Sequence, residues 1–316
     1  MNSVRNLLCF LLGAAATAAF VVLLLPAAPC PYTIADLGMR KLGTVAAVSS
    51  RTDDDEDSLA ELLQRASMAD KTVIMTFADE AATLPGSLLQ IFLESFRLGV
   101  RTQPLLKHLV VVATDARGFD RCRHMHPLCY PLLAGAGADD HPAWARNRFQ
   151  SRVLALGYGF VSTDVASVWF RNPLLRVPAG ADVVTSCDRF HGDNPYDLDK
   201  PAASGGIVYA RPSAAAAAFL AGWYEAMRRH PGERDGPVLD RVKHALAATH
   251  GATVLLMDTA YFAGSCEFSN NFHQVCTFQA NCLDAAQDKI ERLGAVLDEW
   301  KQFRALLGTN TTALTY

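Results

Sequence analysis

The chain has 316 residues, half of them hydrophobic, and a formal net charge of -3 at pH 7. This length and apolar content allow one large buried core or two smaller ones. Because the net charge is close to neutral and the sequence has no basic stripe, its composition excludes the electrostatic footprint of a nucleic-acid-binding protein. We therefore expect no nucleic acid among its partners.

An apolar run over residues 7–25 follows a short tail, 1–6, that carries Arg5. The run has 19 uncharged residues, close to the roughly 20 that a helix needs to cross a bilayer. Arg5 and the amino terminus favour a cytoplasmic tail, so we expect one membrane-anchoring helix and a lumenal remainder. A cleaved signal peptide ending near Ala27 and Ala28 is the alternative, although the run exceeds the usual apolar region of about 7–15 residues.

Residues 26–57 are rich in Pro, Ala, Gly and Ser and end in the acidic run 53–57. This composition predicts a solvated stem. No internal linker or repeat follows, so residues 58–316 are predicted to form one compact domain. One N-glycosylation acceptor, Asn310, lies near its end and is usable only if that end is lumenal.

The predicted domain alternates between strand and helix patterns. Apolar runs predict strands at 72–77, 109–113, 160–161, 182–186, 206–209 and 253–257, and helical patterns lie at 59–67, 85–98, 144–156, 213–229 and 284–307. The alternation predicts an α/β fold with a mostly parallel, Rossmann-like sheet that helices cover on both faces.

Acidic residues follow three of these strands. Asp79 and Asp115 come after the first two, and Thr163 and Asp164 close the third. In an open α/β sheet, ligands bind at the carboxyl ends of the strands, where polar groups of the loops face the crevice. These four residues are therefore candidate ligand-binding residues, with a turn-forming role for Asp164 as the alternative.

Six cysteines lie in the predicted domain: Cys122, Cys129, Cys187, Cys266, Cys276 and Cys282. Their spacings match no common zinc pattern, so the even number favours disulfides in an oxidising compartment, with Cys122 and Cys129 as the easiest local pair. Free buried thiols are the alternative. A zinc site that adds His124, His126 and His141 is less favoured, because these spacings miss the usual pattern.

The segment that starts at Thr163 reads T-D-V-A-S-V-W-F-R-N-P. It resembles T-D-V-D-x-x-W-F-R-D-P, the segment that carries the DxD motif of plant nucleotide-diphospho-sugar transferases, close to glycosyltransferase family 77. The chain has Ala166 in place of the second acid and Asn172 in place of the last one. The resemblance is specific, but it is broken at a functional position.

Further segments carry the same resemblance in the family's order. P-A-A-S-G-G-I-V-Y at 201–209 is similar to P-N-G-G-F-N-Y, R-D-G-P-V-L-D at 234–240 to H-D-Q-D-V-F-N, D-T-A-Y-F-A-G-S-C-E at 258–267 to D-T-A-Y-F-G-G-F-C-E, and V-C-T-F-Q-A-N-C at 275–282 to V-C-T-M-H-A-N-C. The chain departs at Gly236, at Pro237 and at Gln279, which stands where the family has His.

The resemblance implies a GT-A fold that transfers a sugar, with retention, from a nucleotide-diphosphate donor, for which UDP is expected. The candidate donor-binding residues are Asp79, Asp115, Thr163, Asp164, Arg171, Gly205 and Gly206, and the candidate catalytic residues are Asp235, near the sugar, and Asp188, on the acceptor side. A Mn²⁺ or Mg²⁺ ion would be held by Asp164 and Gln279. Because Ala166 offers no ligand atom and an amide is weaker than the family's imidazole, we expect this metal site to be weakened or lost.

The expected function is that of a Golgi transferase, single-pass and type II, which moves a sugar from a UDP donor to a cell-wall polysaccharide or a glycoprotein. The alternative is a catalytically impaired protein of the same fold that binds a glycan or a partner. The departures at Ala166, Gly236, Pro237 and Gln279 motivate it.

Overall fold

The computed structural model describes residues 56–132, 142–190, 194–199, 201–269 and 271–312. They belong to one compact unit, Asp54–Tyr316. Within these ranges no helix is both long and apolar enough to cross a bilayer. The expected membrane span, 7–25, and all but the last two residues of the expected stem lie outside the described residues, so both stay predictions.

A seven-stranded sheet in the order β3-β2-β1-β4-β7-β6-β8 forms the centre of the unit. Its strands are β1 (Thr72–Ala78), β2 (Leu109–Ala113), β3 (Cys129–Pro131), β4 (Gly159–Asp164), β6 (Val183–Arg189), β7 (Ala202–Ala210) and β8 (Val254–Met257). All neighbouring strands are parallel except β7, which runs antiparallel to both β4 and β6. The predicted mostly parallel sheet is confirmed.

A small second sheet, β5-β10-β9, lies beside the first. It consists of β5 (Ser167–Trp169), β9 (Phe262–Gly264) and β10 (Thr277–Gln279). In its register, Gln279 lies opposite Ser167 and Thr277 opposite Trp169. This pairing brings the carboxyl-terminal part of the chain against the turn that follows β4.

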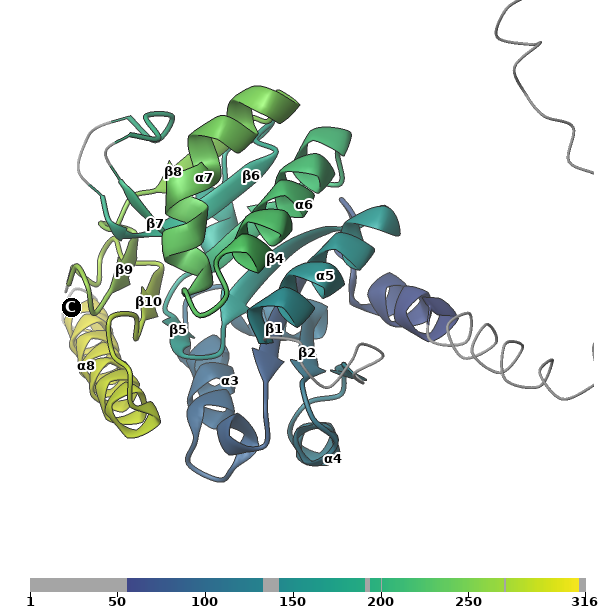
Figure 1. The fold of residues 1–316 in the computed structure, drawn as a ribbon. Coiled ribbons are helices and arrows are strands. Elements are labelled where there is room, and N and C mark those ends of the chain that lie inside the picture. Colours follow the sequence, from purple (N-terminus) through teal and green to yellow (C-terminus); the bar gives the residue numbers. More distant parts are fainter. Residues whose placement is uncertain (1–55, 133–141, 191–193, 200, 270, 313–316) are drawn as a thin grey trace, which may run out of the picture. The chain divides into compact units, whose positions relative to one another are not determined.

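Helices cover both faces of the large sheet, as predicted (Figure 1). One core contains α3 (Leu88–Leu98), α8 (Ala286–Thr312) and the small sheet; the other contains the helical residues 56–66, α5 (Pro142–Ala155), α6 (Ala214–Arg229) and α7 (Asp235–His250). Along β1 the side chains alternate, with Ile74 in the first core and Val73 and Met75 in the second. The apolar residues of β1 therefore pack into the cores on both faces of the sheet.

The structure adds two helices that the sequence did not predict. Helix α4 (Ala116–Met125) lies between β2 and β3, and its N-cap residue Asp115 accepts a hydrogen bond from Gly118 N at 2.7 Å. Helix α7 begins inside the R-D-G-P segment, where Pro237 is tolerated because the first turn leaves its backbone N–H groups unpaired. Helix α3 begins at Leu88, after Ser87, rather than at Pro85.

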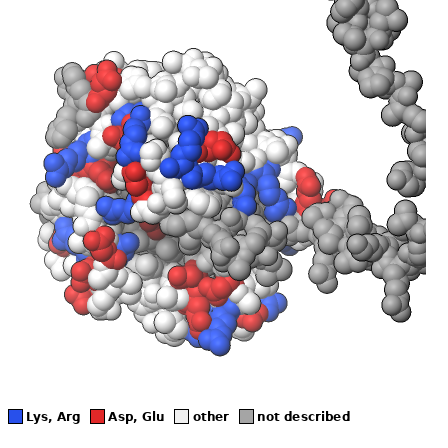
Figure 2. Space-filling model, viewed as in Figure 1, with Lys and Arg blue, Asp and Glu red and all other residues white. Residues whose placement is uncertain are grey.

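Three short 3₁₀ segments complete the described elements: η1 (Ala81–Thr83), η2 (Gln103–His108) and η3 (Pro173–Arg176). The acceptor residue Asn310 lies in the last turn of α8, and its glycosylation stays a prediction. On the face shown in Figure 2, acidic and basic side chains are interspersed.

Disulfides join Cys122 to Cys129 and Cys266 to Cys282. The first pair confirms the prediction. The expectation that all six cysteines form disulfides is wrong, because Cys187 and Cys276 are free and buried. They pack as small apolar groups, which was the alternative reading.

The zinc arrangement is excluded for its described residues. Both cysteines that it needs, Cys122 and Cys129, share a disulfide, and His126 Nε2 lies 2.7 Å from the carbonyl oxygen of Leu109. Burial lowers the pKa of His126, which suits a neutral core histidine. His141 lies outside the described residues.

A buried carboxylate, Asp182, fixes the start of β6. Its Oδ1 accepts hydrogen bonds from Arg211 Nη2 at 2.6 Å and from Ser213 Oγ at 2.7 Å, and its Oδ2 accepts one from Thr253 N at 2.9 Å. Burial opposes the ionisation of Asp182, but these hydrogen bonds together hold its pKa below the ordinary value. The charge therefore ties the starts of three elements, β6, α6 and β8, to one another.

Candidate active site

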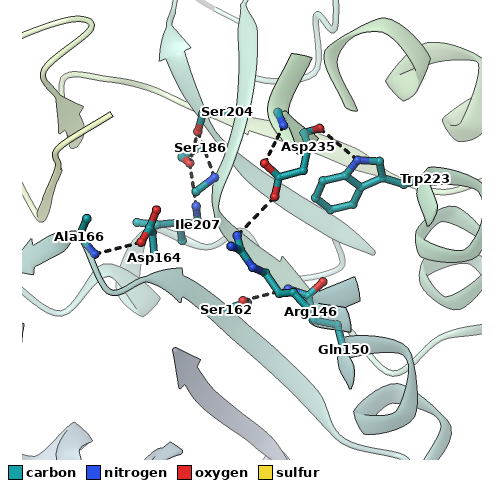
Figure 3. A network of polar contacts seen from close by, with 12 residues as sticks. Arg146, Gln150, Ser162, Asp164, Ala166, Ser186, Ser204, Ile207, Trp223 and Asp235 are labelled. Atoms are coloured by element: carbon teal, nitrogen blue, oxygen red, sulfur yellow. Dashed lines mark hydrogen bonds and ion pairs between the residues drawn. The ribbon is translucent and has the colours of Figure 1, made fainter. Parts of the chain in front are cut away.

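The carboxyl ends of β1, β4 and β6 meet at one edge of the sheet, where the antiparallel strand β7 begins. In the register, Phe77 lies opposite Asp164, and Thr163 lies opposite Ile207. Figure 3 shows Asp164 and Ala166 at the end of β4, with Ser186 and Ser204 on neighbouring strands. The topology thus brings residues from distant parts of the sequence to a single edge.

Asp164 is held in a tight turn between β4 and β5. Its Oδ1 accepts a hydrogen bond from Ala166 N at 3.0 Å, and Ser167 Oγ donates to its carbonyl oxygen at 2.7 Å. Thr163 is buried, and its hydroxyl lies 3.1 Å from Ser167 Oγ. The turn therefore fixes the half-buried Asp164 carboxylate at the strand end, and the contact of Thr163 with Ser167 stabilises the turn.

Ala166 and Gln279 are both buried, each with 4% of its surface exposed. Ala166 packs in the core beneath the small sheet, and its carbonyl oxygen accepts a hydrogen bond from Ala280 N at 3.0 Å. The amide Nε2 of Gln279 donates to Ser186 Oγ at 3.3 Å. Ala166 is thus packed in the core, and Gln279 is hydrogen-bonded to the end of β6.

Ser186 is the centre of an uncharged hydrogen-bond network. Its Oγ lies 2.6 Å from Ser204 Oγ and accepts a hydrogen bond from Ile207 N at 2.9 Å. Ser204 Oγ in turn accepts one from Gly206 N at 3.3 Å. This network, with Gln279, fixes the bend of β7 beside Asp164.

The glycines of the site allow close approach of the backbone. Gly205 has φ +68°, a left-handed conformation that favours glycine, and a Cβ there would lie 3.4 Å from the Trp223 ring. A Cβ on Gly206 would lie 2.4 Å from Oε1 of Gln279, and one on Gly236 would lie 2.3 Å from the carbonyl oxygen of Ser204. Gly236 is therefore required by the packing of α7 against β7.

Asp235 is the first residue of α7 and faces Arg146 on α5 (Figure 3). Arg146 Nη1 lies 3.3 Å from Asp235 Oδ2, and both side chains are partly buried. Asp235 Oδ1 accepts a hydrogen bond from Gly236 N at 3.0 Å, and Trp223 Nε1 donates to the carbonyl oxygen of Asp235 at 3.2 Å. Each carboxylate oxygen thus has one partner, and Trp223 holds the backbone of the same residue.

Asp188 is the last residue but one of β6. Its side chain is half-buried and accepts a hydrogen bond from Asn281 Nδ2 at 2.7 Å. Burial raises its pKa. A ligand atom of Asp188 lies within 4.8 Å of the sulfur atoms of Cys266 and Cys282. Those sulfurs share a disulfide, so they offer no thiolate and this group is no metal site.

Asp79 and Asp115 line a pocket of about 350 Å³ with Glu80, Ala81 and Leu84. Asp79 Oδ1 accepts a hydrogen bond from Ala82 N at 2.8 Å, and Asp115 Oδ2 accepts one from Glu80 N at 2.7 Å. The structure therefore gives both carboxylates a capping role, and their contact with a donor stays a prediction.

The sequence model of the nucleotide-diphospho-sugar transferase family matches residues 104–293. The chain belongs to this family. Two uncharacterized proteins of Arabidopsis thaliana are similar to it: At4g15970 is 34% identical over 271 residues, which cover 81% of this chain and 71% of the relative, and At1g28695 is 30% identical over 263 residues, 78% of each. The resemblance drawn from the motifs is thereby confirmed.

Solved glycosyltransferases show a more distant likeness. A glycosyltransferase involved in the glycosylation of the major capsid of PBCV-1 is 8% identical, with 71% of this chain and 98% of that chain covered and a TM-score of 0.44. Mouse xyloside xylosyltransferase 1 is 13% identical, with coverage of 67% and 98% and a TM-score of 0.41.

A transferase of this family is expected to hold Mn²⁺ or Mg²⁺ through oxygen and imidazole ligands, and the residues present do not fit such a centre. Ala166 has no ligand atom, and the amide of Gln279 is tied to Ser186 and packed against Gly206. Asp164 remains, with one carboxylate oxygen bound to Ala166 N. One carboxylate and one neutral amide oxygen, at the two positions where the family has an acid and an imidazole, do not make a site for a hard divalent cation.

Arg171 is held by contacts with the chain itself, and its contact with a donor stays a prediction. Its Nη2 donates to the carbonyl oxygen of Phe272 at 2.6 Å, and its guanidinium lies 5.5 Å from the centre of the Trp300 ring. Burial lowers the pKa of Arg171. These contacts join the segment after β5 to α8.

Sequence reasoning missed Arg146, Ser186 and Ser204. Ser186 could have been found, because it ends a predicted strand two residues before Asp188. Arg146 lies on a helix, far from any motif, and only the topology brings it to Asp235. No local pattern marks such a residue.

Proposed function

We propose that the chain transfers a sugar from a UDP donor to a polysaccharide or glycoprotein acceptor. The observation that carries this proposal is the position of Asp164 at the carboxyl end of β4, beside the Gly205–Gly206 bend and the oriented carboxylate of Asp235. This is where an open α/β sheet binds nucleotides, in a chain that belongs to the nucleotide-diphospho-sugar transferase family.

In this proposal, each side chain acts through its position. Asp164 orients the donor, the glycine bend lets the donor lie against the backbone, and Asp235 contacts the sugar. When the bond from the sugar to the diphosphate breaks, its electron pair leaves with the diphosphate, and the acceptor oxygen bonds to the sugar carbon. Asp188, whose pKa is raised by burial, is suited to take the proton of the acceptor hydroxyl.

We further propose that the chain is a type II protein of the Golgi membrane with its transferase domain in the lumen. The apolar run 7–25 after Arg5 supports one anchoring helix. The two disulfides support an oxidising compartment. The proposed acceptor is a cell-wall polysaccharide or a glycoprotein.

The second candidate is a catalytically impaired protein that binds a glycan or a partner. Ala166 and Gln279, which remove two expected metal ligands, favour it. Gly236 no longer does, because its lack of a side chain is a packing requirement against Ser204. The two candidates differ in whether a nucleotide-sugar is bound and consumed.

Calorimetric titration of UDP tests the proposed site. We expect wild-type protein to bind UDP and Asp164→Asn to bind it at least about tenfold more weakly, because the substitution removes the carboxylate but keeps the turn. Asp298→Asn is the matched control, since Asp298 is exposed on α8 and pairs only with Lys301 in the described structure. Absence of UDP binding by folded wild-type protein would favour the second candidate.

A further inference from the structure

Two positions at the strand ends lack the side chains that the family resemblance implies as metal ligands. At the two expected ligand positions, Ala166 is a buried methyl group and Gln279 is a neutral amide within a network of hydroxyl groups. An Asp and a His at these positions would hold a cation of charge +2. If no cation binds at these two positions, the negative charge of a bound diphosphate needs a positively charged side chain instead.

Arg146 brings a positive charge to the same edge of the sheet. Its guanidinium lies 5.6 Å from the centre of the Phe77 ring, and Phe77 is the residue opposite Asp164 in the pairing of β1 with β4. Nη1 lies 3.3 Å from Asp235 Oδ2, and the side chain is 31% exposed. Figure 3 shows it extending from α5 toward Asp235, beside the strand ends. The guanidinium is thus held in place while part of it stays accessible.

The hydrogen-bonding capacity of this part of α5 is incompletely used. Among the described residues, Arg146 Nε is buried without a partner. The next residue, Asn147, is 2% exposed, and neither atom of its amide has a partner in the described part of the chain. Buried polar groups are nearly always paired, because an unpaired one loses its hydration without compensation. Two of these atoms, Arg146 Nε and Asn147 Nδ2, are donors that an anionic ligand could satisfy.

We propose that this chain binds its nucleotide diphosphate without a divalent cation, with Arg146 supplying the positive charge. The inference rests on the proposed function, since it concerns the same donor site. A guanidinium presents its N–H donors in a fork that matches phosphate oxygens. A positioned side-chain cation also stabilises charge as it develops on a leaving group. Asp235, through its contact with Arg146, holds the guanidinium in place.

The first test is titration of UDP into the purified full-length protein, in EDTA and then in excess Mn²⁺. We expect the two dissociation constants to agree within about threefold. An affinity that rises by about tenfold or more with Mn²⁺ would overturn the inference and leave the proposed function intact. If UDP binds in neither condition, the inference and the proposed function both fail.

The second test asks whether Arg146 carries the charge. We expect Arg146→Gln to weaken UDP binding by about tenfold or more in EDTA, and Arg146→Lys to recover most of that loss, because a lysine also pairs with phosphate. Arg228→Gln is the matched control; it removes the same charge from an exposed pair with Glu225 on α6. Unchanged affinity in a folded Arg146→Gln protein would refute the assignment, and the metal test on wild-type protein decides the inference even if that variant does not fold.

Discussion

Replacing Gly236 by alanine tests the account of α7 most simply. A Cβ at this position would lie 2.3 Å from the carbonyl oxygen of Ser204 and 2.9 Å from its carbonyl carbon. Both are backbone atoms of β7, so no side-chain rotation relieves the contact. Because carbon–oxygen contacts normally lie at about 3.3–3.6 Å, the start of α7 would have to move by about 1 Å.

Two effects of the Gly236→Ala substitution oppose each other. Alanine in a helix is favoured over glycine by about 1 kcal/mol, whereas forcing an extra methyl group into a packed contact costs about 1–3 kcal/mol. We expect a net loss of about 1 kcal/mol in the free energy of unfolding, which lowers the melting temperature by about 2–4 °C. Because Asp235 is the preceding residue, the shift should also weaken UDP binding.

Thermal unfolding followed by circular dichroism measures the effect, with Gly294→Ala as the control. Gly294 lies within α8, and a Cβ there would meet nothing within 4 Å. We therefore expect Gly294→Ala to raise the melting temperature and Gly236→Ala to lower it. If both substitutions stabilise the protein equally, the close approach of α7 to β7 is refuted.

Three further predictions concern stability and the shape of the site. Asp182→Asn should lower the free energy of unfolding by about 1–2 kcal/mol near pH 7. Because the pKa of Asp182 is depressed in the folded state, wild-type protein should lose this advantage over the variant as the pH falls below about 4. Urea titrations that show the same difference in stability at every pH would contradict this. Cys266→Ala with Cys282→Ala removes a link between residues 16 apart and should cost about 3 kcal/mol. Reduction of the wild-type protein also opens Cys122–Cys129, so it should cost at least as much, and a smaller loss would contradict this. Trp223→Phe removes the hydrogen bond to the carbonyl oxygen of Asp235 and should cost about 1 kcal/mol with weaker UDP binding; unchanged affinity would mean that the indole does not position α7.

The sequence predicted six of the seven strands of the large sheet and missed the three-residue strand β3. Strands such as β2 are short apolar runs, which were predicted with correct bounds, and Asp164 follows such a run directly. The antiparallel direction of β7 has no local signal, because an antiparallel strand buried on both faces has the same apolar pattern as a parallel one.

Other elements could not be predicted from local patterns. Helix α7 starts with Asp235, Gly236 and Pro237, and glycine and proline normally indicate a loop. The three-residue strand β10 is too short to show a period, so nothing in the sequence indicated that Gln279 would pair beside Ser167. Contacts between distant elements are set by topology, which explains why Arg146 was missed.

The departures from the family motif were visible in the sequence, but their meaning was not. Gly236 was interpreted as erosion of the site, and the structure explains it by a close backbone contact with Ser204. Ala166 and Gln279 were interpreted as lost metal ligands, and the structure shows what fills their surroundings. Only the three-dimensional structure shows whether such a departure removes a ligand or is required by the local packing.

Release of UDP from a panel of UDP-sugars is the measurement that tests the central claim most directly. We expect wild-type protein to release UDP from at least one of these donors. Asp235→Asn should reduce the rate by at least about tenfold, and the exposed Asp298→Asn control should keep it. A folded wild-type protein that releases UDP from none of them, or an Asp235→Asn protein that matches wild type, would contradict the claim that this edge of the sheet is a sugar-transfer site.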